Sequence, residues 1–558
     1  MTAATRIADI YRRIRDSGRT EVFITLRDEQ QVAKEYAAAS GPLAGLVLAV
    51  KDNVDVAGLP TTAACPGYAY TPATDAAAVA ALRGAGAVVI GKTNLDQFAT
   101  GLVGTRSPYG AVRDSVRPEY ISGGSSSGSA VAVALGFADI AIGTDTAGSG
   151  RVPAGLQGLI GIKPTLGAIA TDGVVPACAS YDCVTIFAAT LEFAQDAMAV
   201  LGSAAPQRDW PVDAPLAAGP APRVAVPAEL VALDARWRAA FQAAVGRARA
   251  AGFQIVEIAM DDFFAAADLL YNGALVAERA EAVGEFVAAA GPGSGLDPTV
   301  AGIVAAAAGH TATALLADRR EVARLRDRAL AMLGDCDALL VPTAPRHPRI
   351  DEVAADPVGL NTTMGRYTNF CNLFDMCAVA VPAGTVSDGA RFGVTLLAPA
   401  HHDAVLADLA ARFLDTAPGP SWVERCGRVP TAELAVFGLH LRGWPLDHQL
   451  TGRGARWAGP VRTAARYRLV ELDTDPVKPG LIRDDDGGGA IAGERWVLTA
   501  AALGSFLAAL PAPMQLGAID LDDGHSVIGF GCEYQAAAAG RDITELGGWP
   551  AARLAALS

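Results

Sequence analysis

Residues 123–153 read GGSSSGSAVAVALGFADIAIGTDTAGSGRVP. A Gly/Ser-rich loop and a second turn of small residues, which ends at Ser149, lie on either side of one apolar segment. A serine in such a turn can serve as a nucleophile, because its small neighbours let a substrate carbonyl approach the backbone. The first histidine of the chain is His310, so a lysine must be considered as the base, and Lys51 follows an apolar run that is able to bury it.

Apolar runs alternate with helical patterns on both sides of this segment. The strand-like runs are 46–50, 87–91, 138–143, 339–345, 379–384 and 392–399, and the helical patterns are 75–83, 131–135, 229–333 and 403–414. This alternation predicts an α/β core in which sheet strands lie between helices. We expect the reactive residues in turns that follow strand ends.

Three motifs in one order carry a resemblance to a known family. KDN with Lys51, GGSSSG around Ser125 and GTDTAGS ending at Ser149 resemble the amidase signature hydrolases. The resemblance implies the amidase signature fold, with a central mixed β-sheet surrounded by helices. It also implies a Ser–cisSer–Lys triad: Ser149 as nucleophile, Ser125 as proton relay after a cis peptide bond, and Lys51 as base.

The chemistry of such a triad sets physical requirements. A serine hydroxyl is nearly inert at neutral pH without a base, and a lysine is a base only when it is uncharged. Burial favours the uncharged amine, and lowering its pKa by three units costs about 4 kcal/mol. The backbone amides of Thr146, Ala147, Gly148 and Ser149 are the expected oxyanion hole.

Other interpretations of these residues must be weighed. A lysine at a strand end is usually a solvated surface charge. Serines before a helix are often N-caps, which we expect of Ser126, Ser127 and Ser129. Asp145 and Arg151 are expected to pair and to hold the turn. A phosphate-binding loop is a further alternative for GGSSSGS, but no GK[ST] follows.

Longer stretches resemble the allophanate hydrolases within that family. These are GTDTAGSGRVPA, GLIGIKPTLGAIATDGVVPACASYDCVTIFA, VFGLHLRGWPLDHQL and the terminal GRDITELGGWPA. The resemblance implies hydrolysis of allophanate, a small anionic amide, through an acyl-enzyme on Ser149. It releases ammonia and N-carboxycarbamate, with two ammonia and two carbon dioxide overall, as a step in urea, biuret or triazine breakdown. No metal and no organic cofactor is implied.

Tyr271 and Arg279 match the family's carboxylate-binding pair. An arginine suits this role because its planar fork forms two parallel bonds with a carboxylate. On a straight helix the two positions lie far apart, so both reach one ligand only if the segment bends, for example at Gly273. The alternative is that Arg279 pairs with Glu278 or Glu281 on a helix surface.

The chain is expected to divide into a catalytic domain, 1–425, and a C-terminal domain, 430–558. Short strand-like pieces after Pro430 predict a smaller α+β domain, which weakly resembles the γ-glutamyl cyclotransferase-like fold. His440 and His448 are its candidate site residues, for decarboxylation, although assembly of an oligomer is the favoured role of the domain. The Pro-rich stretch 203–227 is predicted to be a surface excursion.

Composition limits the partners. The net charge of −14 and the lack of a basic run argue against nucleic acid and anionic membranes as partners. The eight cysteines have no regular spacing, which favours free thiols in a reducing compartment. The N-terminal stretch is predicted to be a charged helix without the apolar core of a signal peptide, so a cytoplasmic protein is expected. We expect a homodimer or higher homo-oligomer. Alternative functions are the amidase component of a tRNA-dependent amidotransferase, a broad small-amide hydrolase, and an inactive amidase-like scaffold.

Overall fold

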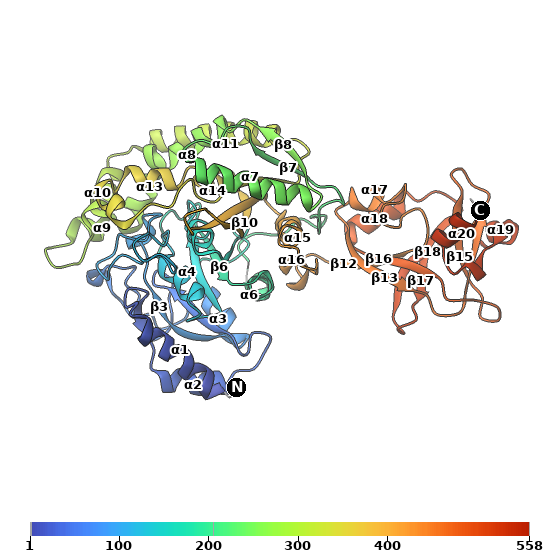
Figure 1. Cartoon of the computed structure of the whole chain (residues 1–558), viewed down its shortest axis with the longest axis horizontal. Helices are drawn as coiled ribbons and strands as arrows, with labels where there is room; N and C mark the ends of the chain where they lie inside the picture. The colour runs from blue at the N-terminus through green and yellow to red at the C-terminus, as the bar shows by residue number, and fades with distance from the viewer. Residues whose placement is uncertain (1–2, 205, 557–558) are drawn as a thin grey trace. The chain divides into compact units, whose positions relative to one another are not determined.

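The computed structural model describes residues 3–204 and 206–556, which form two compact units. The first unit comprises Met1–Asp209 and Arg223–Pro418, and the second comprises Trp210–Pro222 and Gly419–Ser558 (Figure 1). Residues 1, 2, 205, 557 and 558, which fall within the predicted domains, lie outside the described residues.

The first unit is built on one mixed 11-stranded sheet. In spatial order its strands are β1 (Phe23–Leu26), β3 (Val88–Thr93), β2 (Val47–Lys51), β4 (Ile140–Asp145), β6 (Cys183–Ala188), β5 (Ile160–Lys163), β10 (Met376–Thr385), β11 (Arg391–Pro399), β9 (Ala338–Pro342), β7 (Arg223–Pro227) and β8 (Gln254–Ile258). Strand β2 lies between β3 and β4 and is parallel to both. Because all five residues of β2 are buried, its sequence is a continuous apolar run up to the lysine.

Helices surround this sheet, as the α/β prediction requires. They are α1 (Ala3–Ser17), α2 (Glu29–Ala38), α3 (Ala77–Gly84), α4 (Ser127–Ala134), α5 (Val152–Gln157), α6 (Leu191–Ser203), α7 (Ala235–Ala250), α8 (Asp261–Asn272), α9 (Ala277–Ala289), α10 (Pro298–Ala307), α11 (Ala312–Leu333), α12 (Ile350–Ala355), α13 (Gly359–Met364), α14 (Asn369–Leu373) and α15 (Asp403–Phe413), with 3₁₀ turns η1 (Pro66–Tyr68), η2 (Gln97–Ala99) and η3 (Ala274–Val276). Figure 1 shows α1 and α2 near β3, and α7, α8 and α11 near β7 and β8. The mixed α/β fold predicted from the sequence is confirmed.

Five strands of this sheet were not predicted, namely β1, β5, β6, β7 and β8. Strand β7 lies inside the Pro-rich stretch, and β8 lies inside the region predicted to be helical. They pair with each other in parallel at one edge of the sheet. Both are five residues long, and a short apolar run between helical patterns cannot be told from part of a helix by periodicity alone.

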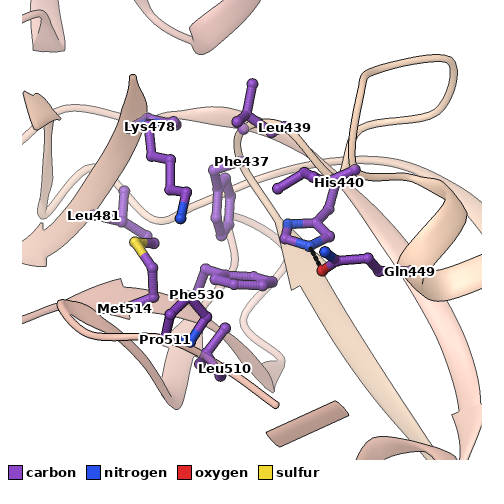
Figure 2. A pocket seen from close by; sticks show the side chains of 13 residues that line it. Phe437, Leu439, His440, Gln449, Lys478, Leu481, Leu510, Pro511, Met514 and Phe530 are labelled. Atoms are coloured by element: carbon purple, nitrogen blue, oxygen red, sulfur yellow. Dashed lines mark hydrogen bonds between the residues drawn. The ribbon is translucent and has the colours of Figure 1, made fainter. Parts of the chain in front are cut away.

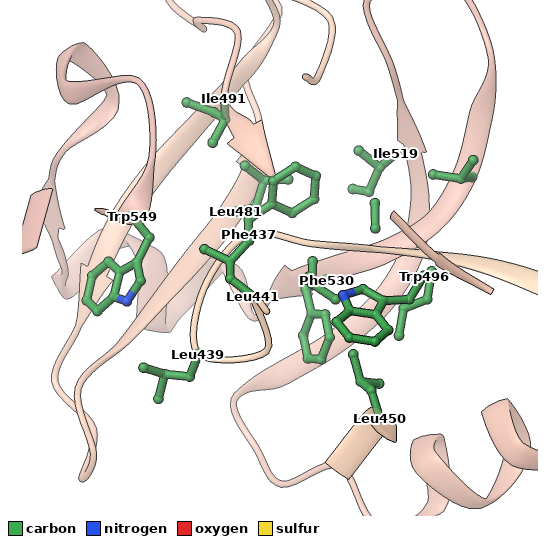
Figure 3. Packing of buried hydrophobic residues seen from close by; sticks show 14 of the residues in the cluster. Phe437, Leu439, Leu441, Leu450, Leu481, Ile491, Trp496, Ile519, Phe530 and Trp549 are labelled. Carbon is green, nitrogen blue, oxygen red and sulfur yellow. The ribbon is translucent and has the colours of Figure 1, made fainter. Parts of the chain in front are cut away.

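The second unit is an α+β domain with its own core. One sheet has the order β13 (Arg456–Arg462), β16 (Ala492–Thr499), β12 (Thr431–Val436), β18 (Ser526–Cys532) and β17 (Met514–Asp520), and a smaller one has β15 (Lys478–Arg483), β14 (Tyr467–Leu472) and β19 (Arg541–Asp542). Its helices are α16 (Trp422–Arg425), α17 (His448–Thr451), α18 (Ala500–Ala508), α19 (Tyr534–Ala539) and α20 (Trp549–Ala555), with the 3₁₀ turn η4 (Thr544–Leu546). Buried Trp496, Phe530 and Leu450 belong to its apolar core (Figure 3).

The segment Trp210–Pro222 packs within this second unit. The Leu216 amide donates to the Gly454 carbonyl at 2.8 Å, and the Trp210 ring meets the Trp422 ring edge-on at 5.5 Å. The prediction of a surface excursion over 203–227 is therefore wrong for residues 210–222, which are part of the C-terminal unit, and for β7, which belongs to the sheet of the first unit.

Among the described residues, no single helix is long and apolar enough to cross a membrane. Helices α10 and α11 pass that test only together, as a pair bent by 97°.

Candidate active site

Lys51 ends strand β2 and is completely buried. Its Nζ donates to Ser125 Oγ at 2.8 Å and to Thr144 Oγ1 at 2.7 Å. Thr144 lies on β4, the parallel neighbour of β2, so the pairing of these two strands brings the threonine beside the lysine. The interpretation of Lys51 as a solvated surface charge is wrong.

The surroundings of Lys51 favour its uncharged form. Burial lowers the pKa of Lys51 from 10.5 to about 7, although the negative charges of Asp96, Asp182 and Asp145 act in the opposite direction. About half of the molecules therefore carry a neutral amine at this position near pH 7.

Ser125 lies in a loop whose backbone leaves no room for a side chain before it. The peptide bond between Gly124 and Ser125 is cis, as the family resemblance implied. A Cβ atom on Gly124 would lie 2.1 Å from Asp96 Oδ2 and 2.6 Å from the Gly104 nitrogen, so only glycine fits. Asp96 fixes this region by accepting from the backbone amides of Gly104 at 2.9 Å and Arg106 at 3.0 Å.

Ser149 lies in the turn between β4 and α5, and a buried ion pair holds that turn. Arg151 Nη2 is 2.8 Å from Asp145 Oδ1, and both side chains are fully buried. Burial alone would raise the pKa of Asp145, but the adjacent Arg151 guanidinium lowers it overall. The predicted pairing of Asp145 with Arg151 is confirmed.

The same carboxylate changes the set of oxyanion donors. The Gly148 amide donates to Asp145 Oδ1 at 2.8 Å, so it is already occupied. No hydrogen bond is found for the amides of Thr146, Ala147 and Ser149 within the described chain. The expected set of four donors is thereby narrowed to these three.

The Ser149 hydroxyl makes no hydrogen bond to any described residue, although the side chain is only 3% exposed. The structure therefore brings Lys51 and Ser125 together but does not join Ser125 to Ser149 by a hydrogen bond. Catalytic hydrogen bonds are often long or poorly aligned without substrate and tighten when it binds.

The three serines near α4 do not cap the helix. Ser126 Oγ donates to the Thr144 carbonyl at 3.1 Å, Ser129 Oγ to the Ile142 carbonyl at 2.8 Å, and Ser127 Oγ to the Asn94 carbonyl at 3.3 Å. Ser126 occupies the N-cap position, but its side chain makes no capping bond, and Ser127 and Ser129 lie within α4. The hydroxyls instead meet carbonyl groups of β4 and of Asn94, which follows β3, so the prediction that these side chains cap the helix is wrong.

Tyr271 and Arg279 come together because the chain bends between them. Helix α8 ends at Asn272, Gly273 leaves helical geometry, and η3 leads into α9. Arg279 Nη2 donates to Tyr271 Oη at 3.3 Å, and Arg279 Nη1 donates to Thr100 Oγ1 at 2.9 Å.

Arg279 does not form the alternative surface ion pair. Its side chain is 3% exposed, and its neighbour Glu278 instead pairs with Arg319 at 2.8 Å. A buried guanidinium that donates to two neutral hydroxyls is suited to bind a small anion.

The C-terminal unit contains a separate pocket. His440 lines it together with Phe437, Lys478 and Phe530, whereas His448 is exposed and is absent from the lining (Figure 2). His440 Nε2 is 3.0 Å from Gln449 Oε1, and its ring stacks on Phe530 at 4.8 Å. Burial lowers the pKa of His440, so the pocket offers a neutral imidazole.

Two residues of the site were missed from the sequence, Thr144 and Thr100. Thr144 is visible only once β2 and β4 are paired. Thr100 follows η2 and reaches Arg279 across 179 positions of sequence. Thr144 lies within the GTDTAGS motif, but nothing in the motif assigns it to the lysine, and Thr100 lies outside the motifs.

Two family models match the chain. The model described as amidase covers residues 11–406, and that of the allophanate hydrolase C-terminal domain covers residues 432–553. The urea amidolyase of Lachancea kluyveri is 41% identical over 566 residues, which cover 94% of this chain and 31% of that protein. This chain thus spans less than a third of that relative's length.

Two further comparisons bear on the alternatives. The structure of Kluyveromyces lactis allophanate hydrolase is similar with a TM-score of 0.88 and 37% identity, covering 100% of this chain and 97% of that one. A glutamyl-tRNA(Gln) amidotransferase component of Halobacterium salinarum is 32% identical over 408 residues, which cover 67% of this chain and 96% of that protein.

Proposed function

We propose that this chain, which belongs to the amidase family, is an allophanate hydrolase. It also carries an allophanate hydrolase C-terminal domain. The single observation that carries the amide chemistry is the buried Lys51 amine, with a pKa of about 7, in contact with Ser125. The similarity to K. lactis allophanate hydrolase over the full chain supports the choice of substrate.

In the proposed reaction, Ser149 Oγ attacks the terminal amide carbon of allophanate. Its proton passes to Ser125 Oγ, whose own proton passes to the neutral Lys51 amine. The negative charge that develops on the carbonyl oxygen is stabilised by the amides of Thr146, Ala147 and Ser149.

The relay then works in reverse. Collapse of the tetrahedral intermediate breaks the C–N bond, and the leaving ammonia takes the proton that Lys51 received. Water next attacks the acyl-enzyme with the same relay as its base, which frees N-carboxycarbamate and restores Ser149. N-carboxycarbamate then loses carbon dioxide to leave carbamate, which breaks down to ammonia and a second carbon dioxide, so the total is two ammonia and two carbon dioxide.

The substrate's carboxylate is assigned to Arg279 and Tyr271. The support is the buried guanidinium, for which hydrogen bonds to two hydroxyl oxygens are the only ones found among residues 3–204 and 206–556. A bidentate arginine–carboxylate contact is stronger than a neutral hydrogen bond, so a substrate anion can compete for the guanidinium.

The C-terminal unit receives a secondary role. Assembly into a homodimer or larger oligomer is one proposal for it, and promotion of decarboxylation through His440 is the other; exposed His448 is the weaker candidate. The eight free thiols support a reducing, cytoplasmic compartment.

The main alternative is the amidase component of a tRNA-dependent amidotransferase, which the similarity to the H. salinarum protein keeps open. That similarity covers 67% of this chain, and the acidic net charge of −14 offers little attraction to tRNA. Ammonia release from allophanate, glutamine and a simple aliphatic amide separates the alternatives, and release from none of them would favour an inactive scaffold.

The substrate assignment is tested by Arg279→Ala on allophanate and on biuret, which has no carboxylate. We expect kcat/KM for allophanate to fall at least about 100-fold, as for a lost charged contact of about 3 kcal/mol, and for biuret to fall far less. Arg326→Ala on α11, where the arginine is exposed and pairs with Asp327, is the matched control. Equal losses on both substrates remove Arg279 from the carboxylate role.

A further inference from the structure

A buried carboxamide without a partner lies on α14. Asn369 is 3% exposed, and its Oδ1 accepts no hydrogen bond from the described residues. No hydrogen bond is found for its Nδ2 either within residues 3–204 and 206–556. Leaving such a group unpaired costs about 1–3 kcal/mol, so a native structure that keeps one calls for a reason.

This carboxamide lines a pocket that also contains Tyr271. Other residues of the pocket include Asp268, Thr362 and Arg366. A Cβ atom added to Gly365 would lie 2.3 Å from Asn369 Oδ1, so the backbone at Gly365 closes one side of the carboxamide. The pocket lies against another part of this side chain.

The position of Asn369 ties it to the reacting groups. Its neighbour Thr368 donates from Oγ1 to the Ala147 carbonyl at 2.7 Å, in the turn that carries Ser149. On the other side, Tyr271 accepts a hydrogen bond from Arg279. The residue before Asn369 thus contacts the turn of the nucleophile, and Tyr271, which lines the same pocket as Asn369, contacts Arg279.

We propose that Asn369 is a specificity-determining residue that recognises the N–H group of an N-carboxylated amide in the Tyr271 pocket. This inference rests on the proposed function. In allophanate an N–H stands directly beside a carboxylate oxygen, which forms a donor next to an acceptor. A carboxamide presents the complementary pair, with Oδ1 accepting from the N–H and Nδ2 donating to the carboxylate oxygen.

The pairing distinguishes allophanate from malonamate, in which CH₂ replaces that N–H. A site built to bond a substrate N–H discriminates against an analogue that lacks it, because its buried acceptor is left unpaired. The wild-type protein is therefore expected to prefer allophanate over malonamate, and part of this preference is assigned to Asn369.

The experiment measures kcat/KM for both substrates in wild type and in Asn369→Leu, together with the thermal midpoint of each protein. Leucine has the same number of side-chain heavy atoms in the same branched shape and needs no partner. We expect the preference for allophanate to fall about fivefold to tenfold, the worth of one hydrogen bond, while the thermal midpoint stays the same or rises. The inference fails if the variant keeps the wild-type preference, or if both substrates lose equally as the midpoint drops.

Asn361→Leu on α13 is the matched control. The Asn361 carboxamide is also buried, but it accepts from the Leu102 amide at 2.7 Å. This variant is expected to lower the thermal midpoint, because it strands the Leu102 amide, without changing the substrate preference.

The experiment gives a different result if the proposed function itself is wrong. It would appear as a wild-type protein that does not release ammonia from allophanate, and this would overturn both proposals. Turnover of allophanate with an unchanged preference in Asn369→Leu would overturn only the role of Asn369.

Discussion

Replacing Lys51 by methionine tests the central physical claim, that a buried neutral amine is the base. Methionine fills a similar volume without a charge, so the change removes the amine and leaves an apolar group in its place. Loss of a general base typically lowers kcat by about 10²–10⁴-fold. The wild-type profile should carry the signature of the amine: kcat/KM rises about tenfold per pH unit below pH 7 and levels off near pH 8.

The same amine has a predictable effect on stability. The pKa of Lys51 is about 7 in the folded protein and near 10.5 in the unfolded chain. Between these values the unfolded state binds more protons, so the contribution of Lys51 to stability rises with pH. Below pH 7 the buried amine costs about 5 kcal/mol relative to a group whose pKa does not change.

The assay is urea unfolding of wild type and Lys51→Met at pH 7 and pH 9, following the transition of the first unit. The free energy of unfolding of wild type, relative to the variant, should rise by about 2 kcal/mol between these pH values. Groups that titrate in both proteins cancel in this difference. A kcat/KM that is flat from pH 5 to 9, or a stability difference that does not change with pH, would refute the reasoning.

Three other changes give separate expectations. Thr144→Val removes a hydroxyl that contacts the Lys51 amine at 2.7 Å; kcat should fall about tenfold with KM little changed, and an equal rise in KM would argue for a binding role. Asp145→Ala leaves Arg151 buried without its charge partner; the loss should be about 3–5 kcal/mol by urea unfolding, and a stable variant would contradict it. His440→Ala lies in the other unit; ammonia release by an unchanged amidase site should stay within about twofold of wild type, and a large loss would show that the two units are coupled.

The fold was predictable where the sequence repeats a simple pattern. Strand β2 reads VLAV before Lys51 and β4 begins with IAI, because both faces of these strands are buried, and the strands were located to within two residues. Strand β8 was not predicted, because the hydrophobic periodicity of a five-residue strand between helical patterns does not distinguish it from part of a helix.

The site was predictable in its motif residues but not in its supporting contacts. Lys51, Ser125 and Ser149 have roles that their motifs indicate, whereas Thr144, although it lies in the same motif as Ser149, comes beside Lys51 only through the pairing of β2 with β4. The occupied Gly148 amide and the carbonyl-bonded serines of α4 are likewise consequences of tertiary packing. Local sequence cannot distinguish a free amide or hydroxyl from an occupied one.

The placement of Trp210–Pro222 in the second unit has a consequence for how the protein is made. During synthesis this strip leaves the ribosome about two hundred residues ahead of Trp422 and Gly454, the groups on which it packs. Domains generally fold as units, N-terminal first. The first unit is therefore synthesised and folds before the segment Trp210–Pro222 has its packing partners. A gene divided between Pro418 and Gly419 would produce a first half with this apolar segment exposed and a second half that lacks part of its core.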